Sequence, residues 1–222
     1  KRYRSPKGRY YEDSEARLLI ELLQKNKIIL DVASGTGKNI KALHGYCELI
    51  IGSDISFKML EVSKKKCKKN SINNFILVQA DANKLPFHTK SVDAVLSTKF
   101  FHNIPIKNHR SLFLEMSRVS KSKIIIELMN KLNWLGLKYL ISILLFKKTK
   151  FNRYYLPWLH HLIIGNHKKL DLKGFGVGLP FSESLFKNFP KIFKTINQLM
   201  INSPLKFIAA KNFLLIKSSK SR

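Results

Sequence analysis

Five short apolar runs, each followed by a longer amphipathic or polar segment, limit what this chain can fold into. Each run has the length of a buried strand, and crossovers of roughly a dozen residues or more separate successive runs. Such alternation of strand and helix predicts an α/β fold, with a mostly parallel sheet covered by helices on both faces. The predicted strands are Ile28–Ala33, Leu49–Ser53, Phe75–Ala80, Val92–Ser97 and Ile124–Leu128.

The chain is predicted to form a single domain over residues 1–222, since no repeat or linker divides it. Within this domain we distinguish an N-terminal cap segment (1–26), a core (27–130) and a variable region with closing strands (131–222). We expect the first helix to begin near Ser14, with Asp13 or Ser14 as its N-cap. Further predictions are a glycine-rich turn at Gly174–Gly178, a last helix over Ser182–Ile201 and a closing strand over Asn212–Ser218.

The most apolar segment, Leu132–Phe146, follows the fifth predicted strand and is flanked by lysines. At about 15 residues it is shorter than the roughly 20 that a membrane-spanning helix needs. It is therefore either an ordinary buried helix or a helical insertion that lies in a membrane interface or covers an apolar substrate pocket.

Charge is the most unusual bulk property of the chain. There are 41 Lys and Arg residues against 14 Asp and Glu residues, giving a formal net charge of +27. This balance favours nucleic acid, anionic lipid or phosphorylated substrates as partners. An AT-rich genome also produces an excess of lysine over arginine on ordinary protein surfaces. The net charge alone therefore does not identify a function.

The two cysteines, Cys47 and Cys67, are too few for a disulfide scaffold and indicate reduced thiols. No secretory segment is visible at the start of the sequence. We therefore expect a protein of the cytoplasm or of the membrane surface that faces it.

A small-residue turn follows the first predicted strand, in the sequence Ile29-Leu-Asp-Val-Ala-Ser-Gly-Thr-Gly37. Gly35 and Gly37 carry no Cβ, which lets backbone come close to a ligand. A dinucleotide-binding turn needs a third glycine where Ile40 stands, and a phosphate-binding loop needs a G-x-x-x-x-G-K-[ST] pattern that is missing here. Both of these nucleotide sites are excluded.

Two further acids follow the next two strands, Asp54 at the end of LIIGSD and Asp81 at the end of VQAD. A carboxylate at the first position suits both hydroxyls of a ribose. The second acid suits an exocyclic adenine amine. A single acid at a strand end is usually a turn residue. Three acids at successive strand ends, Asp31, Asp54 and Asp81, favour a ligand site.

These motifs, in this order and spacing, resemble those of class I S-adenosylmethionine (SAM) dependent methyltransferases of type 11, the group of the ubiquinone and menaquinone biosynthesis enzymes. Asp31–Gly37 (DVASGTG) is similar to the family's D-x-G-x-G-x-G, with Ala33 at the first glycine. Asp54 and Asp81 match the family's two acids, and SVDAVLS its fourth strand. The resemblance covers about residues 15–130; where the family has a Lys-Pro-Gly-Gly turn, Lys121–Lys123 is shorter and lacks glycine.

The resemblance implies a Rossmann-like, doubly wound sheet of seven strands that binds SAM and releases S-adenosylhomocysteine. The ribose would lie on Asp54, the adenine near Asp81, and the methionine portion against residues 33–37. The implied cofactor-binding residues are Asp31, Ala33, Ser34, Gly35, Gly37, Asp54, Ile55, Asp81, Ala82, Ser97 and Thr98.

His102 is the candidate general base, because it follows the fourth strand near the expected acceptor position. Alternatively, it packs over the cofactor or bonds a loop. His109, His160 and His161 are weaker candidates. No His/Cys cluster has metal-site spacing, so we predict no metal.

Three functions remain open at this point. The first is methyl transfer to a small-molecule or lipid-like acceptor, with an anionic membrane surface as a further partner. The second is RNA methylation, which the charge favours; the [DN]-P-P-[FY] pattern of base amino-methyltransferases is replaced here by Ser97–Phe100 (STKF). The third is a non-catalytic binding module, which would be expected to lose part of the set of acids and glycines.

Overall fold

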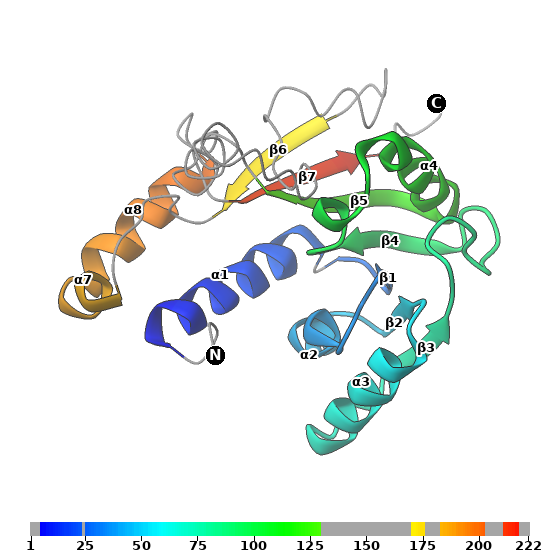
Figure 1. Cartoon of the computed structure of the whole chain (residues 1–222), viewed down its shortest axis with the longest axis horizontal. Coiled ribbons are helices and arrows are strands. Elements are labelled where there is room, and N and C mark those ends of the chain that lie inside the picture. Colours follow the sequence, from blue (N-terminus) through cyan, green and yellow to red (C-terminus); the bar gives the residue numbers. More distant parts are fainter. Residues whose placement is uncertain (1–4, 24, 130–169, 176–182, 203–210, 218–222) are drawn as a thin grey trace, which may run out of the picture.

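The computed structural model describes residues 5–23, 25–129, 170–175, 183–202 and 211–217. Its centre is a seven-stranded sheet with the strand order β3-β2-β1-β4-β5-β7-β6 (Figure 1). Neighbours among β1 to β5 pair in parallel, whereas β7 pairs antiparallel with both β5 and β6. The prediction of a mostly parallel seven-stranded sheet is confirmed. The strands are β1 (Ile28–Val32), β2 (Leu49–Asp54), β3 (Phe75–Gln79), β4 (Val92–Ser97), β5 (Ser120–Met129), β6 (Leu170–Phe175) and β7 (Lys211–Lys217).

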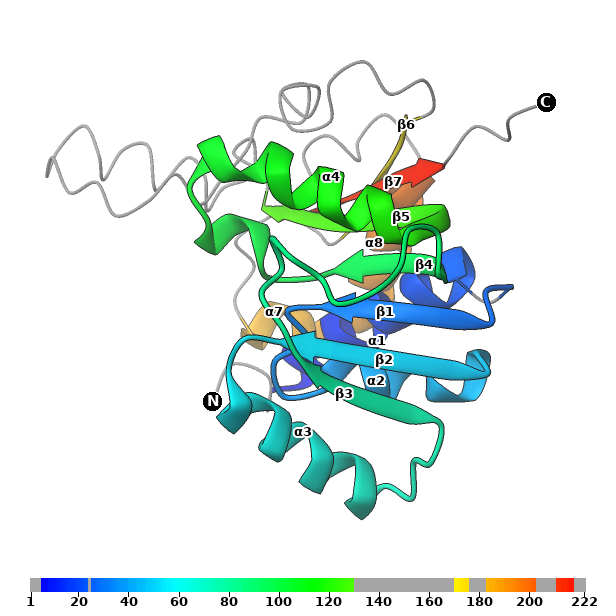
Figure 2. The same ribbon diagram turned by 90° about the vertical axis from the view of Figure 1, so that its right-hand side faces the viewer.

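Apolar layers lie on both faces of the sheet because successive residues of a strand point to opposite sides. Ile29 of β1 belongs to a cluster with α1 (Pro6–Leu23), α2 (Lys38–Leu43) and α3 (Phe57–Lys69). Leu30 belongs to a cluster with α4 (His109–Val119) on the other face. Figure 2 shows α4 in front of the sheet and α1 and α2 behind it, with the arrowheads of β1, β2 and β4 at one common edge. The short helices η2 (His44–Tyr46), η3 (Phe101–Asn103) and η4 (Ile106–Asn108) lie in connections.

The predicted start of the first helix is wrong. α1 begins at Pro6, and Ser5 is at its start, where the Ser5 hydroxyl accepts a hydrogen bond from the Gly8 N–H. Ser14 lies inside the helix, where its hydroxyl donates to the carbonyl oxygen of Tyr10. A serine can lie inside a helix when its hydroxyl bonds the carbonyl oxygen of the preceding turn. Residues 6–13 lack the apolar periodicity from which a helix is predicted.

The predicted last helix over Ser182–Ile201 is two helices, α7 (Glu183–Asn188) and α8 (Pro190–Asn202). Proline lacks an N–H and is suited to a first helical position, so Pro190 begins a new helix. The predicted turn at Gly174–Gly178 is also wrong at Gly174, which lies in β6. The closing strand is confirmed as β7, shifted by one residue, and the Leu132–Phe146 prediction lies outside the described residues.

None of the helices in the described ranges is long and apolar enough to span a membrane.

Candidate functional site

The turn after β1 is built on left-handed backbone. Ala33, Gly35 and Gly37 have φ angles of 58°, 54° and 73°. This conformation strains any residue with a Cβ, which explains why a glycine suits the position that Ala33 occupies. The turn is further fixed by the Ser34 N–H, which donates to the carbonyl oxygen of Ser53 at 2.9 Å.

The two glycines have different roles. A Cβ on Gly35 would meet no atom within 4 Å, so this residue borders open space at the strand edge. A Cβ on Gly37 would lie 2.2 Å from Ser63 Oγ, so this residue lets the start of α2 approach α3. Gly35 therefore leaves room beside the backbone, and the packing of α2 on α3 requires a glycine at Gly37. The contact of both glycines with a ligand stays a prediction.

Gly37→Ala is expected to destabilise the fold by about 2–3 kcal/mol, because it adds a clash with Ser63 to the left-handed strain. Gly35→Ala adds only the strain and is expected to cost about 1 kcal/mol. Urea unfolding measures both. Adding Ser63→Ala to Gly37→Ala should recover part of the loss; equal losses at both glycines and no recovery would contradict the packing role of Gly37.

Asp54 is held at the end of β2 by backbone donors. Its Oδ2 accepts from the Gly35 N–H at 2.8 Å, and its Oδ1 accepts from the Ser56 N–H at 2.9 Å. The Ser56 hydroxyl in turn caps α3 by accepting a hydrogen bond from the Met59 N–H. The half-buried carboxylate thus lies directly beside the glycine turn. Ile55 next to it is 68% exposed.

Asp31 is fully buried, and the Asn39 amide at 3.1 Å from both carboxylate oxygens is its hydrogen-bond partner. Burial raises the pKa of Asp31 to about 7, against the effect of the Asn39 hydrogen bond. The same Asn39 amide donates to Thr98 Oγ1 at 2.9 Å and so joins the ends of β1 and β4. Sequence reasoning missed Asn39; a polar residue beside Ile40 on a short buried helix was the available signal.

The end of β4 places Ser97 and Thr98 differently. The buried Ser97 hydroxyl donates to the carbonyl oxygen of Val32 at 3.0 Å and links β4 to β1. Thr98 is half-buried, and its hydroxyl oxygen accepts the hydrogen bond from the Asn39 amide that also bonds Asp31. The next residue, Lys99, has a φ of 58°, so the chain turns sharply here.

Asp81 lies after β3 in an exposed turn, where Asp81 Oδ1 accepts from the backbone and side-chain N–H groups of Asn83. Its neighbour Ala82 is half-buried. Two residues of α4 fix the loop that follows: Glu115 Oε1 accepts from the Leu85 N–H, and Arg118 donates to the carbonyl oxygens of Leu85 and Phe87. The Ala80 N–H also donates to the Asp54 carbonyl oxygen, so the ends of β2 and β3 are adjacent.

The histidines divide clearly. His102 is half-buried in η3, just beyond the end of β4. His109 is buried, with its Nε2 3.0 Å from the carbonyl oxygen of Ile104 and its ring edge-on to Phe101; burial lowers its pKa. His109 is therefore a core residue, while His160 and His161 lie outside the described ranges. Within those ranges no group of three or more His, Cys, Asp or Glu side chains could hold a metal ion.

A buried charge cluster missed by sequence reasoning ties α1 to this edge of the sheet. Glu15 lies 2.5 Å from the ammonium groups of both Lys38 and Lys211, and Lys211 lies 2.9 Å from Glu127 of β5. Burial of Glu15 favours its neutral form, but Lys211, Lys38 and Lys99 outweigh burial and lower its pKa. Because Lys38 begins α2, the cluster fixes α1 against the helix that follows the glycine turn.

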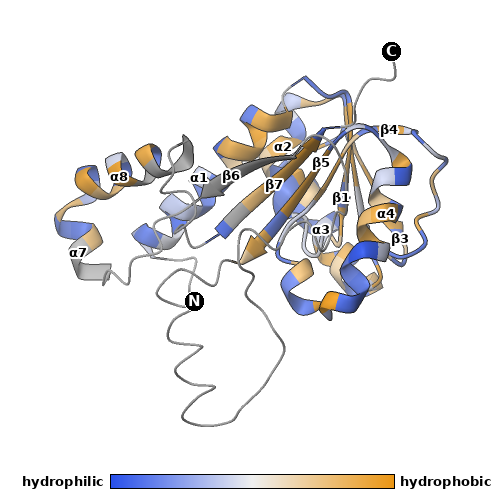
Figure 3. Ribbon diagram, turned by 90° about the horizontal axis from the view of Figure 1, so that it is seen from above, coloured by the Kyte–Doolittle hydropathy of each residue, from blue (hydrophilic) through white to orange (hydrophobic). Residues whose placement is uncertain are grey.

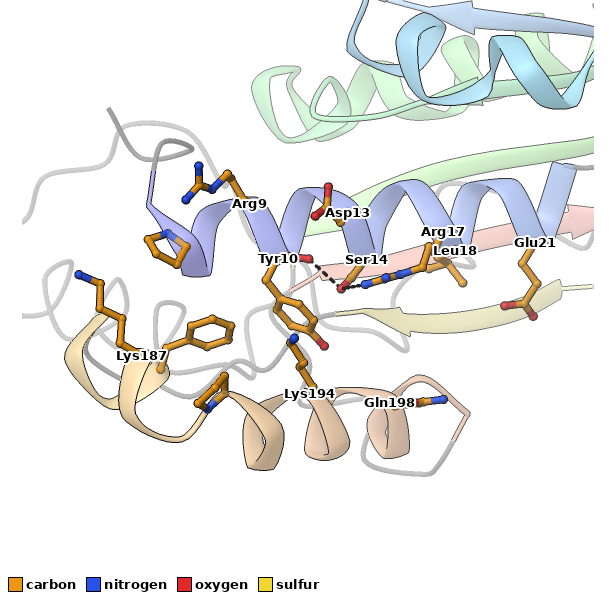
Figure 4. A pocket seen from close by; sticks show the side chains of 13 residues that line it. Arg9, Tyr10, Asp13, Ser14, Arg17, Leu18, Glu21, Lys187, Lys194 and Gln198 are labelled. Carbon is orange, nitrogen blue, oxygen red and sulfur yellow. Dashed lines mark hydrogen bonds between the residues drawn. The ribbon is translucent and has the colours of Figure 1, made fainter.

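A groove of about 950 Å³ runs between α1 and the α7–α8 pair (Figure 4). Its walls include Tyr10, Arg17 and Leu18 of α1, and Phe186 and Lys194 of α7 and α8. None of the predicted cofactor residues lines it.

Known proteins resemble this chain in sequence and in fold. A methyltransferase-domain family model matches residues 30–126. A demethylmenaquinone methyltransferase from Staphylococcus epidermidis is 31% identical over 182 residues, which cover 75% of this chain and 73% of that protein. The uncharacterized protein MJ1252 of Methanocaldococcus jannaschii is 30% identical over 147 residues, covering 65% of this chain. The match spans only about half (53%) of that archaeal relative.

Among solved structures, the magnesium protoporphyrin IX methyltransferase of Synechocystis with bound S-adenosylhomocysteine is similar, with a TM-score of 0.65. The alignment covers 94% of this chain and 82% of that one at 17% identity. At this identity the likeness concerns the fold.

Proposed function

The chain belongs to the class I SAM-dependent methyltransferase family, and we propose that it binds SAM at the carboxyl ends of β1, β2 and β3 and transfers the methyl group to a small-molecule acceptor. The observation that carries the proposal is the juxtaposition of Gly35, which borders open space, with the Asp54 carboxylate that its N–H helps to hold. An adenosyl group needs both features, room beside backbone and an acceptor for its ribose hydroxyls.

The donor set fits SAM in three further respects. Asp31 offers a buried carboxylate to the ammonium group of the methionine portion. The buried Ser34 hydroxyl has no hydrogen-bond partner among the described residues and is available to the same portion. Asp81 lies beyond the neighbouring strand, on the side proposed for the adenine amine. We assign the remaining predicted contacts to Ala33, Gly37, Ile55, Ala82, Ser97 and Thr98.

SAM supplies a methyl group already activated by its sulfonium, so the chain's main task is positioning. Well-oriented reactants gain up to roughly 7–11 kcal/mol over free encounter. The hydrogen bonds on Asp54 and Asp31 hold both acids in place before any ligand arrives. His102 is half-buried beyond β4, and we propose that it removes a proton from the methyl acceptor.

An apolar, lipid-like acceptor is the finer part of this proposal. It is supported by the names of two similar proteins, which act on a demethylmenaquinone and on a magnesium porphyrin. The net charge of +27 favours RNA as the alternative acceptor. A purely non-catalytic module is disfavoured because Asp31, Gly35 and Asp54 are all present and placed together.

Calorimetric titration with SAM and with S-adenosylhomocysteine is the first test. Both ligands are expected to bind one site, with dissociation constants on the order of micromolar. Formation of S-adenosylhomocysteine is then followed with a quinol, a porphyrin and an RNA as methyl acceptors. Absence of binding by a folded protein would refute the proposed function, whereas turnover with RNA alone would replace the acceptor class.

A further inference from the structure

The groove between α1 and the α7–α8 pair has an aromatic wall. Phe186 packs on the Tyr10 ring of α1 at 5.4 Å between centroids, and buried Phe193 lies 6.0 Å behind Phe186. These contacts hold the pair against α1, at the end of the molecule opposite α3 and β3 (Figure 3). The groove volume of about 950 Å³ is near the upper end of the roughly 300–1000 Å³ that small-molecule sites occupy. Its apolar lining residues are Pro6, Tyr10, Leu18, Phe186 and Pro190.

Cationic side chains line the groove from both walls, namely Arg9 and Arg17 of α1 and Lys187 and Lys194 of α7 and α8. Within the described part of the chain, none of the four is ion-paired with an acid. The Lys194 ammonium instead lies over the Tyr10 ring, 5.9 Å from its centroid. The Arg17 guanidinium is 3.5 Å from the Ser14 hydroxyl. The groove therefore presents cations that no described carboxylate neutralises directly.

The acids of α1 are placed away from these cations. Glu12 and Glu15 pair with Lys38 at 3.5 and 2.5 Å, and neither of these acids lines the groove. Asp13 and Glu21 do line it. Figure 4 shows Asp13 directed away from α8 and Glu21 at the opposite end of the groove from α7. The lining thus has four cations against two acids, so it attracts an anion.

We propose that the groove binds an organic anion with a flat apolar body, the chemical class of an aromatic carboxylate or sulfonate. The apolar body packs along the rings of Tyr10 and Phe186. The anionic group meets Arg17 and Lys194, whose head groups Figure 4 shows beside the Tyr10 side chain, one from each wall. A guanidinium offers paired N–H donors that match the oxygens of such an anion, and an ammonium adds a point charge.

This ligand is additional to SAM, because none of the residues proposed to hold SAM lines the groove. Anilinonaphthalene sulfonate, a flat aromatic anion whose fluorescence rises on binding, is the probe. The titration contains saturating S-adenosylhomocysteine, so that the proposed cofactor site is occupied. We expect one site with a dissociation constant on the order of ten micromolar. Phenylnaphthylamine, which has similar rings and no sulfonate, should bind about tenfold more weakly or worse.

The cations are tested by paired substitutions. Arg17→Gln with Lys194→Gln is expected to weaken probe binding about tenfold or more, because each change removes a charged hydrogen-bond donor. The matched control is Arg110→Gln with Lys191→Gln, which removes the same two charges at exposed positions outside the groove. This control variant should bind the probe like the wild type.

A second control concerns the apolar side chains of α8 outside the groove. Ile192 is 56% exposed and Leu199 is 64% exposed, so Ile192→Ser with Leu199→Ser tests whether the probe binds there instead; its affinity should be unchanged. Equal losses in the two charge variants, a loss in this α8 variant, or equal affinity for the uncharged probe would overturn the proposal. Absence of probe binding by the folded wild type would also overturn it. SAM titration of the Arg17→Gln, Lys194→Gln variant should match the wild type, which separates this result from a failure of the proposed function.

Discussion

Asp31→Asn is expected to make the free protein more stable at pH 8 and to remove most of its affinity for SAM. The Asp31 carboxyl is fully buried, and burial raises its pKa from 3.8 to about 7. Above pH 7 such a carboxyl is ionised in the folded protein, at a cost on the order of 4 kcal/mol relative to the unfolded chain. Asparagine removes the charge but must still be desolvated, so we expect a gain of about 2 kcal/mol.

The pH dependence gives the sign of this effect. The pKa of Asp31 is higher in the folded protein than in the unfolded chain. Its contribution to stability is therefore fully present below the unfolded pKa, where the carboxyl is protonated in both states. The free energy of unfolding then falls as pH rises from about 4 to about 7. The advantage of Asp31→Asn over the wild type should therefore grow across this window and stay constant above it. Urea unfolding at pH 5 and pH 8 measures it.

Asp93→Asn is the matched control, because the surroundings of the Asp93 carboxylate favour its ionised form. Burial alone would raise its pKa, but N–H groups of Ile28 and Lys27 and the Lys121 ammonium lower it. Its stabilising effect is present above the unfolded pKa and lost as pH falls, so Asp93→Asn should destabilise at pH 8. If Asp31→Asn also destabilises at pH 8, the buried carboxylate is structural and its assignment to the SAM ammonium is wrong.

Much of the parallel core is predictable from the sequence for a local reason. β1, β2 and β4 are buried on both faces, so each must be a short, nearly continuous apolar run. The positions of Asp54 and Asp81 then follow, because a polar residue must end such a run where the chain leaves the sheet. The Ser56 cap of α3 was predictable for the same reason.

The rest depends on contacts between distant parts of the chain. Glu15 pairs with Lys211, which is 196 positions away, and a local pattern holds no trace of that pair. Asn39 reads as an ordinary helix residue until the fold brings Asp31 and Thr98 to it. The separate functions of Gly35 and Gly37 are likewise decided by where Ser63 lies.

Asp54→Ala is expected to weaken SAM binding by about a hundredfold or more while the protein stays folded. Two charge-assisted hydrogen bonds from a ribose contribute roughly 1.5–3 kcal/mol each, and every 1.4 kcal/mol is tenfold in affinity. The substitution also removes the acceptor for the Gly35 and Ser56 N–H groups. Both groups lie at a solvent-accessible edge, so we expect a stability cost of about 1–2 kcal/mol, below what unfolds a domain.

Two measurements separate lost ribose contacts from a loosened turn. Ser56→Ala removes the α3 cap and should cost about 1 kcal/mol in urea unfolding, because the Met59 N–H loses its acceptor. Ser56→Ala leaves the Asp54 carboxylate and its bond to Gly35 in place, so its SAM affinity by calorimetry should match the wild type. If Ser56→Ala loses as much affinity as Asp54→Ala, the turn geometry and not the carboxylate controls binding. If Asp54→Ala binds SAM within threefold of the wild type, the ribose lies elsewhere, and with it the whole orientation proposed for the cofactor on the strand ends.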